Sequence, residues 1–168
     1  MMKRSTFLLG LGAAFLSACG GGSKFRRYNG PEVTRILLYK GRRRLYLMNH
    51  GEVLESYRVR LGFAPRGHKR IEGDGRTPEG NYLIDRKNPN SSFHLSVGIS
   101  YPNRNDVAAA RALGRSPGGD IFIHGAPRPG SRANGDEDWT AGCIAVTNRE
   151  IEEIFAMVNL GTPITIYP

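Results

Sequence analysis

Residues 120–148 read DIFIHGAPRPGSRANGDEDWTAGCIAVTN, and the rest of the chain is organised around this stretch. His124 ends one apolar run, Cys143 opens another, and each stands beside a glycine, Gly125 or Gly142. A cysteine attacks as its thiolate and needs a lowered pKa or a nearby base, a task for which histidine is well suited. The pattern therefore indicates a thiol nucleophile with an imidazole base.

The spacing and the glycines suggest how such a site would be built. Fifteen residues separate His124 from Thr140, enough loop to bring neighbouring strands and their two functional side chains together. Gly125 and Gly142 carry no side chain, so a substrate backbone can approach closely. We expect the amides of Gly142 and Cys143 to donate hydrogen bonds to the oxyanion that forms on attack.

The N-terminus predicts export. Lys3 and Arg4 form a basic start, and residues 7–16 form an apolar run too short to remain as a membrane helix. The run ends in Leu16-Ser17-Ala18-Cys19, which resembles a bacterial lipobox, where the chain is cut before an acylated cysteine. The alternative is an ordinary signal peptide in which Cys19 is incidental.

Three segments follow from the lipobox. Residues 1–18 are a lipoprotein signal peptide, residues 19–32 a lipidated Cys19 with a flexible Gly/Ser tether, and residues 33–168 a catalytic domain. Gly20 rather than aspartate follows the cysteine, which favours a periplasm-facing domain anchored to the outer membrane. Acyl chains on Cys19 would hold the domain on the membrane, since each buried CH₂ group contributes ~0.8 kcal/mol of binding free energy.

Lipidation would leave Cys143 as the only free thiol, since the chain has two cysteines. An unpaired thiol in an oxidising compartment is a liability unless it is used, although a buried inert cysteine is the alternative. The formal charge of the mature chain falls from +9 to +7 with the loss of Lys3 and Arg4. Export argues against nucleic acid as a partner and favours anionic envelope material.

The pattern along the domain is mainly β. Two helices are expected: a short one over residues 107–113, capped by Asn105 or Asp106, and a well-defined one that starts at the capping box of Thr147 and Glu150. Strands are expected over residues 33–39, 44–48, 53–61, 81–84, 93–101, 121–123, 142–146 and 162–167. These elements predict a β-sandwich of mixed sheets.

These motifs together resemble the L,D-transpeptidase (YkuD-type) catalytic domain. The resemblance rests on His124-Gly125, on Thr140-x-Gly142-Cys143-Ile144 and on Asn148 five residues after the cysteine. The turn Thr77-Pro78-Glu79-Gly80 and the closing residues 161–166 also match. The resemblance extends over residues 33–167 and implies a YkuD-like fold.

The resemblance also implies a reaction. Cys143 would attack the carbonyl that links the third residue of a peptidoglycan stem peptide, usually meso-diaminopimelate, to D-Ala. His124 would be the base, and the Gly125 carbonyl would orient its imidazole. The thioester would pass to an amine, giving a 3→3 crosslink, an anchored protein or an exchanged D-amino acid. No cofactor or metal is implied.

Two positions depart from the family's common S-H-G-C-I-R motif. Ala141 stands where the second histidine is usual, and Ala145 replaces an arginine thought to hold substrate. A branch with G-C-x-A-[MV]-T looks similar and resembles members that cleave envelope peptide links by hydrolysis. An L,D-carboxypeptidase or amidase-type hydrolase is therefore an alternative. A non-catalytic wall-binding module is another, against which the intact His124 and Cys143 argue.

The loop between the two functional residues supplies further candidates. Trp139, Thr140, Arg128 and Arg132 are candidates for binding substrate, with Trp139 as a wall of the cleft. Alternatively, the acidic residues 136–138 pair with the arginines of the same loop and set its closed shape. His124 and Cys143 alone do not make a zinc site, which needs about four ligands. His94 is expected to have a structural role.

Overall fold

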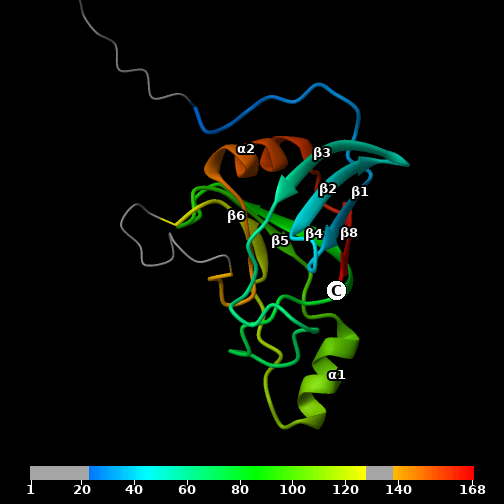
Figure 1. Cartoon of the computed structure of the whole chain (residues 1–168), viewed down its shortest axis with the longest axis vertical. Coiled ribbons are helices and arrows are strands. Elements are labelled where there is room, and N and C mark those ends of the chain that lie inside the picture. Colours follow the sequence, from blue (N-terminus) through cyan, green and yellow to red (C-terminus); the bar gives the residue numbers. More distant parts are fainter. Residues whose placement is uncertain (1–22, 128–137) are drawn as a thin grey trace, which may run out of the picture.

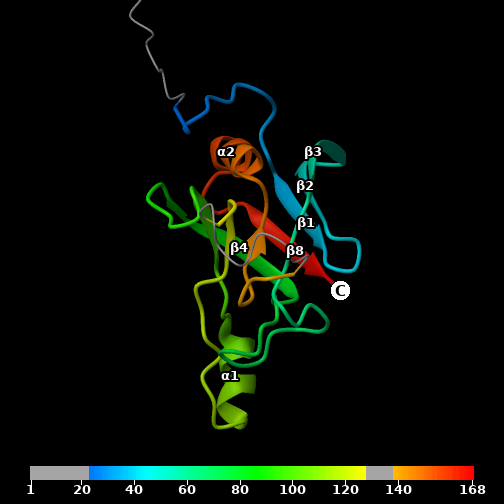
Figure 2. The same cartoon turned by 60° about the vertical axis from the view of Figure 1, so that its left-hand side comes forward.

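The computed structural model describes residues 23–127 and 138–168, and within them eight strands form one curled sheet with two helices (Figures 1 and 2). The strand order is β3-β2-β1-β8-β4-β5-β6-β7. The strands are β1 (Arg35–Tyr39), β2 (Arg44–Asn49), β3 (Glu52–Arg58), β4 (Gly80–Asn88), β5 (Ser96–Ile99), β6 (Phe122–His124), β7 (Ile144–Ala145) and β8 (Pro163–Tyr167). The helices are α1 (Arg104–Ala112) and α2 (Asn148–Met157).

Strand β4 divides the sheet into two halves. Its first residues, Gly80 to Leu83, pair with β8, and its later residues, Ile84 to Asn88, pair with β5 across a register irregularity. Pairing is mixed, because β1 lies parallel to β8 and β6 parallel to β7, while the other neighbours are antiparallel. The predicted mainly β fold with mixed sheets and two helices is confirmed.

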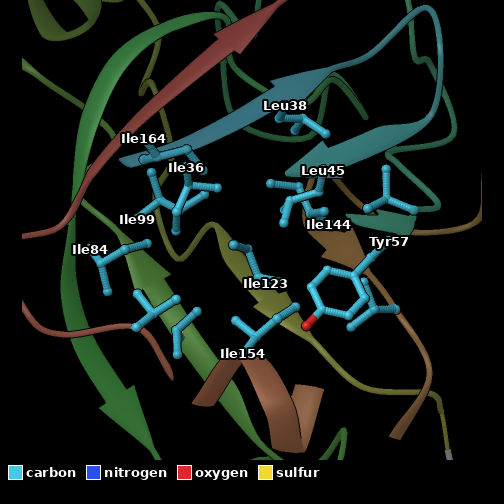
Figure 3. Close-up of a cluster of buried hydrophobic side chains, with 14 of the residues drawn as sticks. Ile36, Leu38, Leu45, Tyr57, Ile84, Ile99, Ile123, Ile144, Ile154 and Ile164 are labelled. Atoms are coloured by element: carbon cyan, nitrogen blue, oxygen red, sulfur yellow. The ribbon is translucent and has the colours of Figure 1, made fainter. Parts of the chain in front are cut away.

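One core holds the two halves together (Figure 3). Ile36 and Leu38 of β1 belong to the same cluster as Ile123 of β6, Ile144 of β7 and Ile154 of α2, and all five side chains are fully buried. Burying an isoleucine side chain contributes about 1.5–3 kcal/mol to folding. Since Ile123 and Ile144 point into the core, alternation along the strands turns their neighbours to the opposite face.

The helices follow their capping residues. In α2 the Thr147 side chain accepts from the Glu150 amide and the Glu150 carboxylate accepts from the Thr147 amide, as predicted. The short helix α1 was also predicted, but its cap was wrong, because Asn103 is the N-cap and forms a capping box with Asp106. No helix in residues 23–127 or 138–168 is long and apolar enough to cross a membrane.

Some strand ends also differ from the prediction. Strand β4 continues to Asn88 through the polar residues Asp85 to Lys87, whereas we expected it to end at Ile84. Strand β7 is limited to Ile144 and Ala145, because the residues before it turn through Gly142 at a positive φ. That turn sets the position of Cys143.

Candidate active site

The pairing of β6 with β7 brings His124 close to Cys143. Ile123 lies beside Ile144 and His124 beside Ala145, so one step back along both strands Cys143 lies beside Phe122. The Phe122 amide donates to Cys143 Sγ at 3.4 Å, which confirms this register. His124 follows the core-facing Ile123, and Cys143 precedes the core-facing Ile144. Both side chains therefore lie on the face of the sheet opposite the core.

The imidazole of His124 is held in one tautomer. Its Nδ1 lies 2.8 Å from the Gly125 carbonyl oxygen, which can only accept, so Nδ1 carries the proton. Burial lowers the pKa of His124, an effect that the bond to the Gly125 carbonyl partly opposes. His124 is 3% exposed and therefore neutral at pH 7, and among the described residues no hydrogen bond engages the lone pair on its Nε2.

Aromatic rings fix the plane of this imidazole. The Phe93 ring lies 4.5 Å from it, centroid to centroid, and the Trp139 ring 5.6 Å away, in an edge-to-face arrangement. Trp139 also lines a cavity of about 160 Å³ together with Arg60, Ala126, Pro127, Ala145, Val146 and Thr147. Trp139 thus lines a cavity next to His124, and its role as a wall of the substrate cleft stays a prediction.

Gly125 is confined by the chain around it. A Cβ atom there would lie 2.6 Å from Asn148 Oδ1 and 2.7 Å from the Phe93 carbonyl oxygen. Both distances are shorter than the contacts that Cβ atoms make in proteins. Asn148 Oδ1 accepts from the Ala126 amide at 2.9 Å. The first residue of α2 therefore holds the chain that leaves His124, which explains why the motif extends to Asn148.

Cys143 is a protonated thiol in this environment. Burial raises its pKa, while the Phe122 amide and the Lys69 ammonium act in the opposite direction. Its Sγ donates to the Asp120 carbonyl at 3.4 Å, and within residues 23–127 and 138–168 no hydrogen bond joins it to His124. A neutral thiol and a neutral imidazole therefore share this face of the sheet.

A cavity of about 400 Å³ opens beside the thiol. It is lined by Cys143, Lys69, Glu72, Gly73, Gly118, Gly119, Asp120, Ile121 and Ala141. Lys69 is a buried cation whose Nζ donates to Asp74 Oδ1 at 2.9 Å and to the Ile71 carbonyl at 3.0 Å. Sequence reasoning missed Lys69, because its loop is joined to the cysteine only by tertiary structure.

Comparisons with known proteins show the family of the chain. The YkuD model, described as an L,D-transpeptidase catalytic domain, matches residues 33–166. The chain belongs to the YkuD family. YafK of Escherichia coli strain K12 is 32% identical over 126 residues, which make up 70% of this chain and 45% of YafK.

Solved structures show the same YkuD fold. The helical cell shape determining protein Pgp2 from Campylobacter jejuni is 31% identical, with a TM-score of 0.62 over 83% of this chain and 49% of Pgp2. An L,D-transpeptidase from Mycobacterium smegmatis, 16% identical, matches with a TM-score of 0.54 over 81% of this chain and 59% of its own. This YkuD chain spans about half the length of YafK and Pgp2.

Two groups that were expected to meet substrate or the oxyanion make hydrogen bonds inside this YkuD domain. Thr140 was expected to bind substrate, but it is 4% exposed and its Oγ1 donates to the Cys143 carbonyl at 2.6 Å. The same oxygen accepts from the Gly142 amide at 3.2 Å, so that amide is engaged inside the turn. The Cys143 amide has no such partner among the described residues and remains the candidate oxyanion donor.

The acidic end of the YkuD loop also differs from expectation. Asp138 was expected to pair with an arginine of the same loop, but its carboxylate binds Arg43, with Nη2 2.6 Å from Oδ2 and Nε 3.0 Å from Oδ1. Asp138 Oδ1 also accepts from the Leu61 amide at 2.8 Å. Arg43 thus holds the start of the segment that carries Trp139. The bond is non-local, which is why the sequence pattern did not reveal it.

The other residues singled out in the sequence are His94, two loop arginines and Cys19. His94 Nε2 lies 2.8 Å from Glu152 Oε1, a contact in keeping with the structural role expected for it. Arg128, Arg132 and Cys19 lie outside the described residues, so their roles stay predictions. Within the part of the chain that the structure describes, no three His, Cys, Asp or Glu side chains group as metal ligands.

Alkylation of Cys143 is expected to speed up steadily with pH. Burial raises the thiol's pKa, so the thiolate fraction should increase about tenfold per pH unit up to pH ~8.5, and still increase beyond it. The measurement is the iodoacetamide rate between pH 6 and 10 on the full chain carrying Cys19→Ser, with free cysteine as the reference. A plateau between pH 6 and 8 would indicate a preformed thiolate–imidazolium pair instead.

Replacing Gly142 by alanine is expected to displace the thiol. Gly142 has a φ of 135°, and a Cβ atom there would lie 2.7 Å from the Arg76 carbonyl oxygen. We expect the free energy of unfolding to fall by about 1–3 kcal/mol and acylation of Cys143 to slow markedly. Gly161→Ala is the control, because Gly161 has a φ of 85° but open space around it. Equal losses of acylation in both variants would contradict this explanation.

Proposed function

We propose that this YkuD domain is a cysteine-dependent acyltransferase that acts on peptidoglycan stem peptides. Cys143 is the nucleophile and His124 the base. One observation carries the proposal: a buried imidazole whose Nδ1 proton is bound by the Gly125 carbonyl leaves Nε2 free on the strand next to the thiol. A base with its pKa below the usual value accepts a proton only transiently and returns it to the leaving group.

The first half of the reaction forms a thioester. The thiol turns from the Asp120 carbonyl toward His124, and Nε2 takes its proton as sulfur attacks the carbonyl that precedes D-Ala. The Cys143 amide donates to the oxyanion. The carbon–nitrogen bond then breaks, and the proton on Nε2 passes to the amine of the leaving D-Ala.

The second half regenerates the thiol. An amine attacks the thioester carbon and gives its proton to Nε2, the carbon–sulfur bond breaks, and sulfur recovers the proton. The products are a 3→3 crosslink, an anchored protein or an exchanged D-amino acid. No step needs a metal or a cofactor.

Hydrolysis of the thioester is the second candidate. Ala141 lines the Cys143 cavity, and its methyl group leaves room for water where the family's common motif has an imidazole. Pgp2, a relative of similar structure, is described as a helical cell shape determining protein. A domain that trims stem peptides would remove D-Ala and pass the acyl group to water.

The place of action is the cell envelope. The basic, apolar start and the lipobox over residues 16–19 support export and acylation of Cys19. The domain would then face the periplasm from the outer membrane, with peptidoglycan within reach of its tether. Detection of a diacylglyceryl adduct on Cys19 by mass spectrometry of the protein from its own membranes tests this anchor.

Product analysis with defined muropeptides tests the reaction. Tetrapeptide muropeptides are incubated with the chain, and the products are followed by mass spectrometry. D-Ala release together with dimers supports amine transfer, and monomeric tripeptide alone supports hydrolysis. If the tetrapeptide stays intact, the acyltransferase proposal for this substrate is wrong. Retention of tetrapeptide by an inactive chain would then indicate a wall-binding module.

A further inference from the structure

Arg60 lies directly across from the position at which the family's arginine is missing. The Arg60 amide donates to the Ala145 carbonyl at 2.9 Å, and the Ala145 amide donates to the Arg60 carbonyl at 2.8 Å. Residues that exchange both hydrogen bonds in an antiparallel pair have Cα atoms ~5.5 Å apart. Their side chains emerge side by side on one face of the sheet.

That face is the one that carries the catalytic residues. Val59 and Leu61 are buried in the core, so Arg60 between them points away from it. Ala145 in turn lies beside His124 in the parallel pairing of β6 with β7. His124, Ala145 and Arg60 therefore form a row across three adjacent strand segments, with the methyl group of Ala145 in the middle.

The guanidinium of Arg60 could bind a substrate group, because no ion pair among the described residues engages it. Arg60 is exposed, and among residues 23–127 and 138–168 its side chain has no ion pair. It lines the cavity of about 160 Å³ that Trp139, Ala145 and Thr147 also line, next to the imidazole. Ala145 and Arg60 both line this cavity, and the small side chain of Ala145 takes up little of it.

We propose that Arg60 supplies the carboxylate-binding guanidinium that other members carry at the position of Ala145. Its ligand is a free carboxylate of the stem peptide, bound beside His124. The inference rests on the proposed function, since it names a residue that holds that substrate. A guanidinium suits this task because its planar fork can bind both oxygens of a carboxylate.

Steady-state kinetics of D-Ala release by the full chain test this role. Arg60→Ala is expected to lower kcat/KM about 10- to 100-fold, mainly through KM, because a hydrogen-bonded ion pair to substrate is lost. Arg60→Lys should recover only part of this loss, since an ammonium lacks the fork. Arg111→Ala, an exposed arginine of α1, removes the same charge and should leave KM unchanged.

A transposed variant separates substrate binding from a structural role. Arg60→Ala combined with Ala145→Arg moves the guanidinium across the bridge, and we expect it to restore KM toward the wild-type value. Loss of folding in Arg60→Ala, visible as a lower Tm, would leave Arg60→Lys and the substrates below to decide. An unchanged KM in both single variants would overturn the inference.

Amidated substrates identify which carboxylate is bound. Tetrapeptides are compared in which either the D-Ala carboxylate or the side-chain carboxylate of the third residue is an amide. The wild type should lose affinity for one of them, and Arg60→Ala should not distinguish that peptide from the free acid. Equal discrimination by both proteins would overturn the inference while leaving the acyltransferase intact. Absence of D-Ala release by the wild type would instead contradict the proposed function, and this inference with it.

Discussion

Cys143→Ala is expected to abolish D-Ala release from tetrapeptide muropeptides, with a fall in rate of more than about 10⁴-fold. The reason is chemical, because alanine has no atom that can form the thioester. Folding should be retained, since within the part of the chain that the structure describes the thiol makes only two long hydrogen bonds of 3.4 Å, to the Phe122 amide and the Asp120 carbonyl. Release of D-Ala is measured by mass spectrometry.

The matched comparison is Cys143→Ser. Serine keeps a hydroxyl at the same place, but a hydroxyl loses its proton far less readily than a thiol, so the variant should show at most trace activity. Tm values of both variants should lie near the wild-type value. Substantial turnover by Cys143→Ala would show that another residue is the nucleophile.

His124→Asn is expected to slow acylation of Cys143 by about 10²- to 10⁴-fold, the usual contribution of a positioned base. Asparagine can keep a donor at the place of Nδ1 and so preserve the bond to the Gly125 carbonyl, which is 2.8 Å long with histidine. It has no group that can act as Nε2. The variant therefore removes the base and leaves its support in place, and the measurement is the single-turnover rate of D-Ala release.

His50→Asn is the control for this substitution. His50 is exposed in the turn between β2 and β3 at a φ of 50°, a conformation that asparagine tolerates, so its replacement should change neither rate nor Tm. A wild-type acylation rate in His124→Asn would contradict the role of His124. Loss of the base should also remove the acid limb of the pH profile, which for the wild type should lie below pH ~6.5 because burial lowers the pKa of His124.

Local signals in the sequence predicted most of the fold. Alternating apolar residues located the strands, and the Thr147–Glu150 capping box located the start of α2. The prediction of the α1 cap failed because several residues there can serve as caps. Asn103, Asn105 and Asp106 can all cap a helix, and the choice of Asn103 depends on which side chain reaches the free amides of the first turn.

The candidate site was predictable only in part. His124, Cys143 and Gly125 lie within a single contiguous motif, so their chemistry could be inferred from residue type and spacing. Arg60 belongs to a distant segment, and its place beside Ala145 is set by the curl of the sheet. The hydroxyl of Thr140 was assigned to substrate because the sequence does not show that the Cys143 carbonyl already binds it.

The most direct test of the thioester mechanism is the mass of the protein itself. The full chain is mixed with a defined tetrapeptide, quenched in acid within one turnover, and analysed by intact-mass and peptide-mapping mass spectrometry. The mechanism predicts a mass increase equal to the tripeptide acyl group, on the fragment that contains Cys143, with one D-Ala released per adduct. D-Ala release without any adduct on Cys143, or an adduct on another residue, would contradict it.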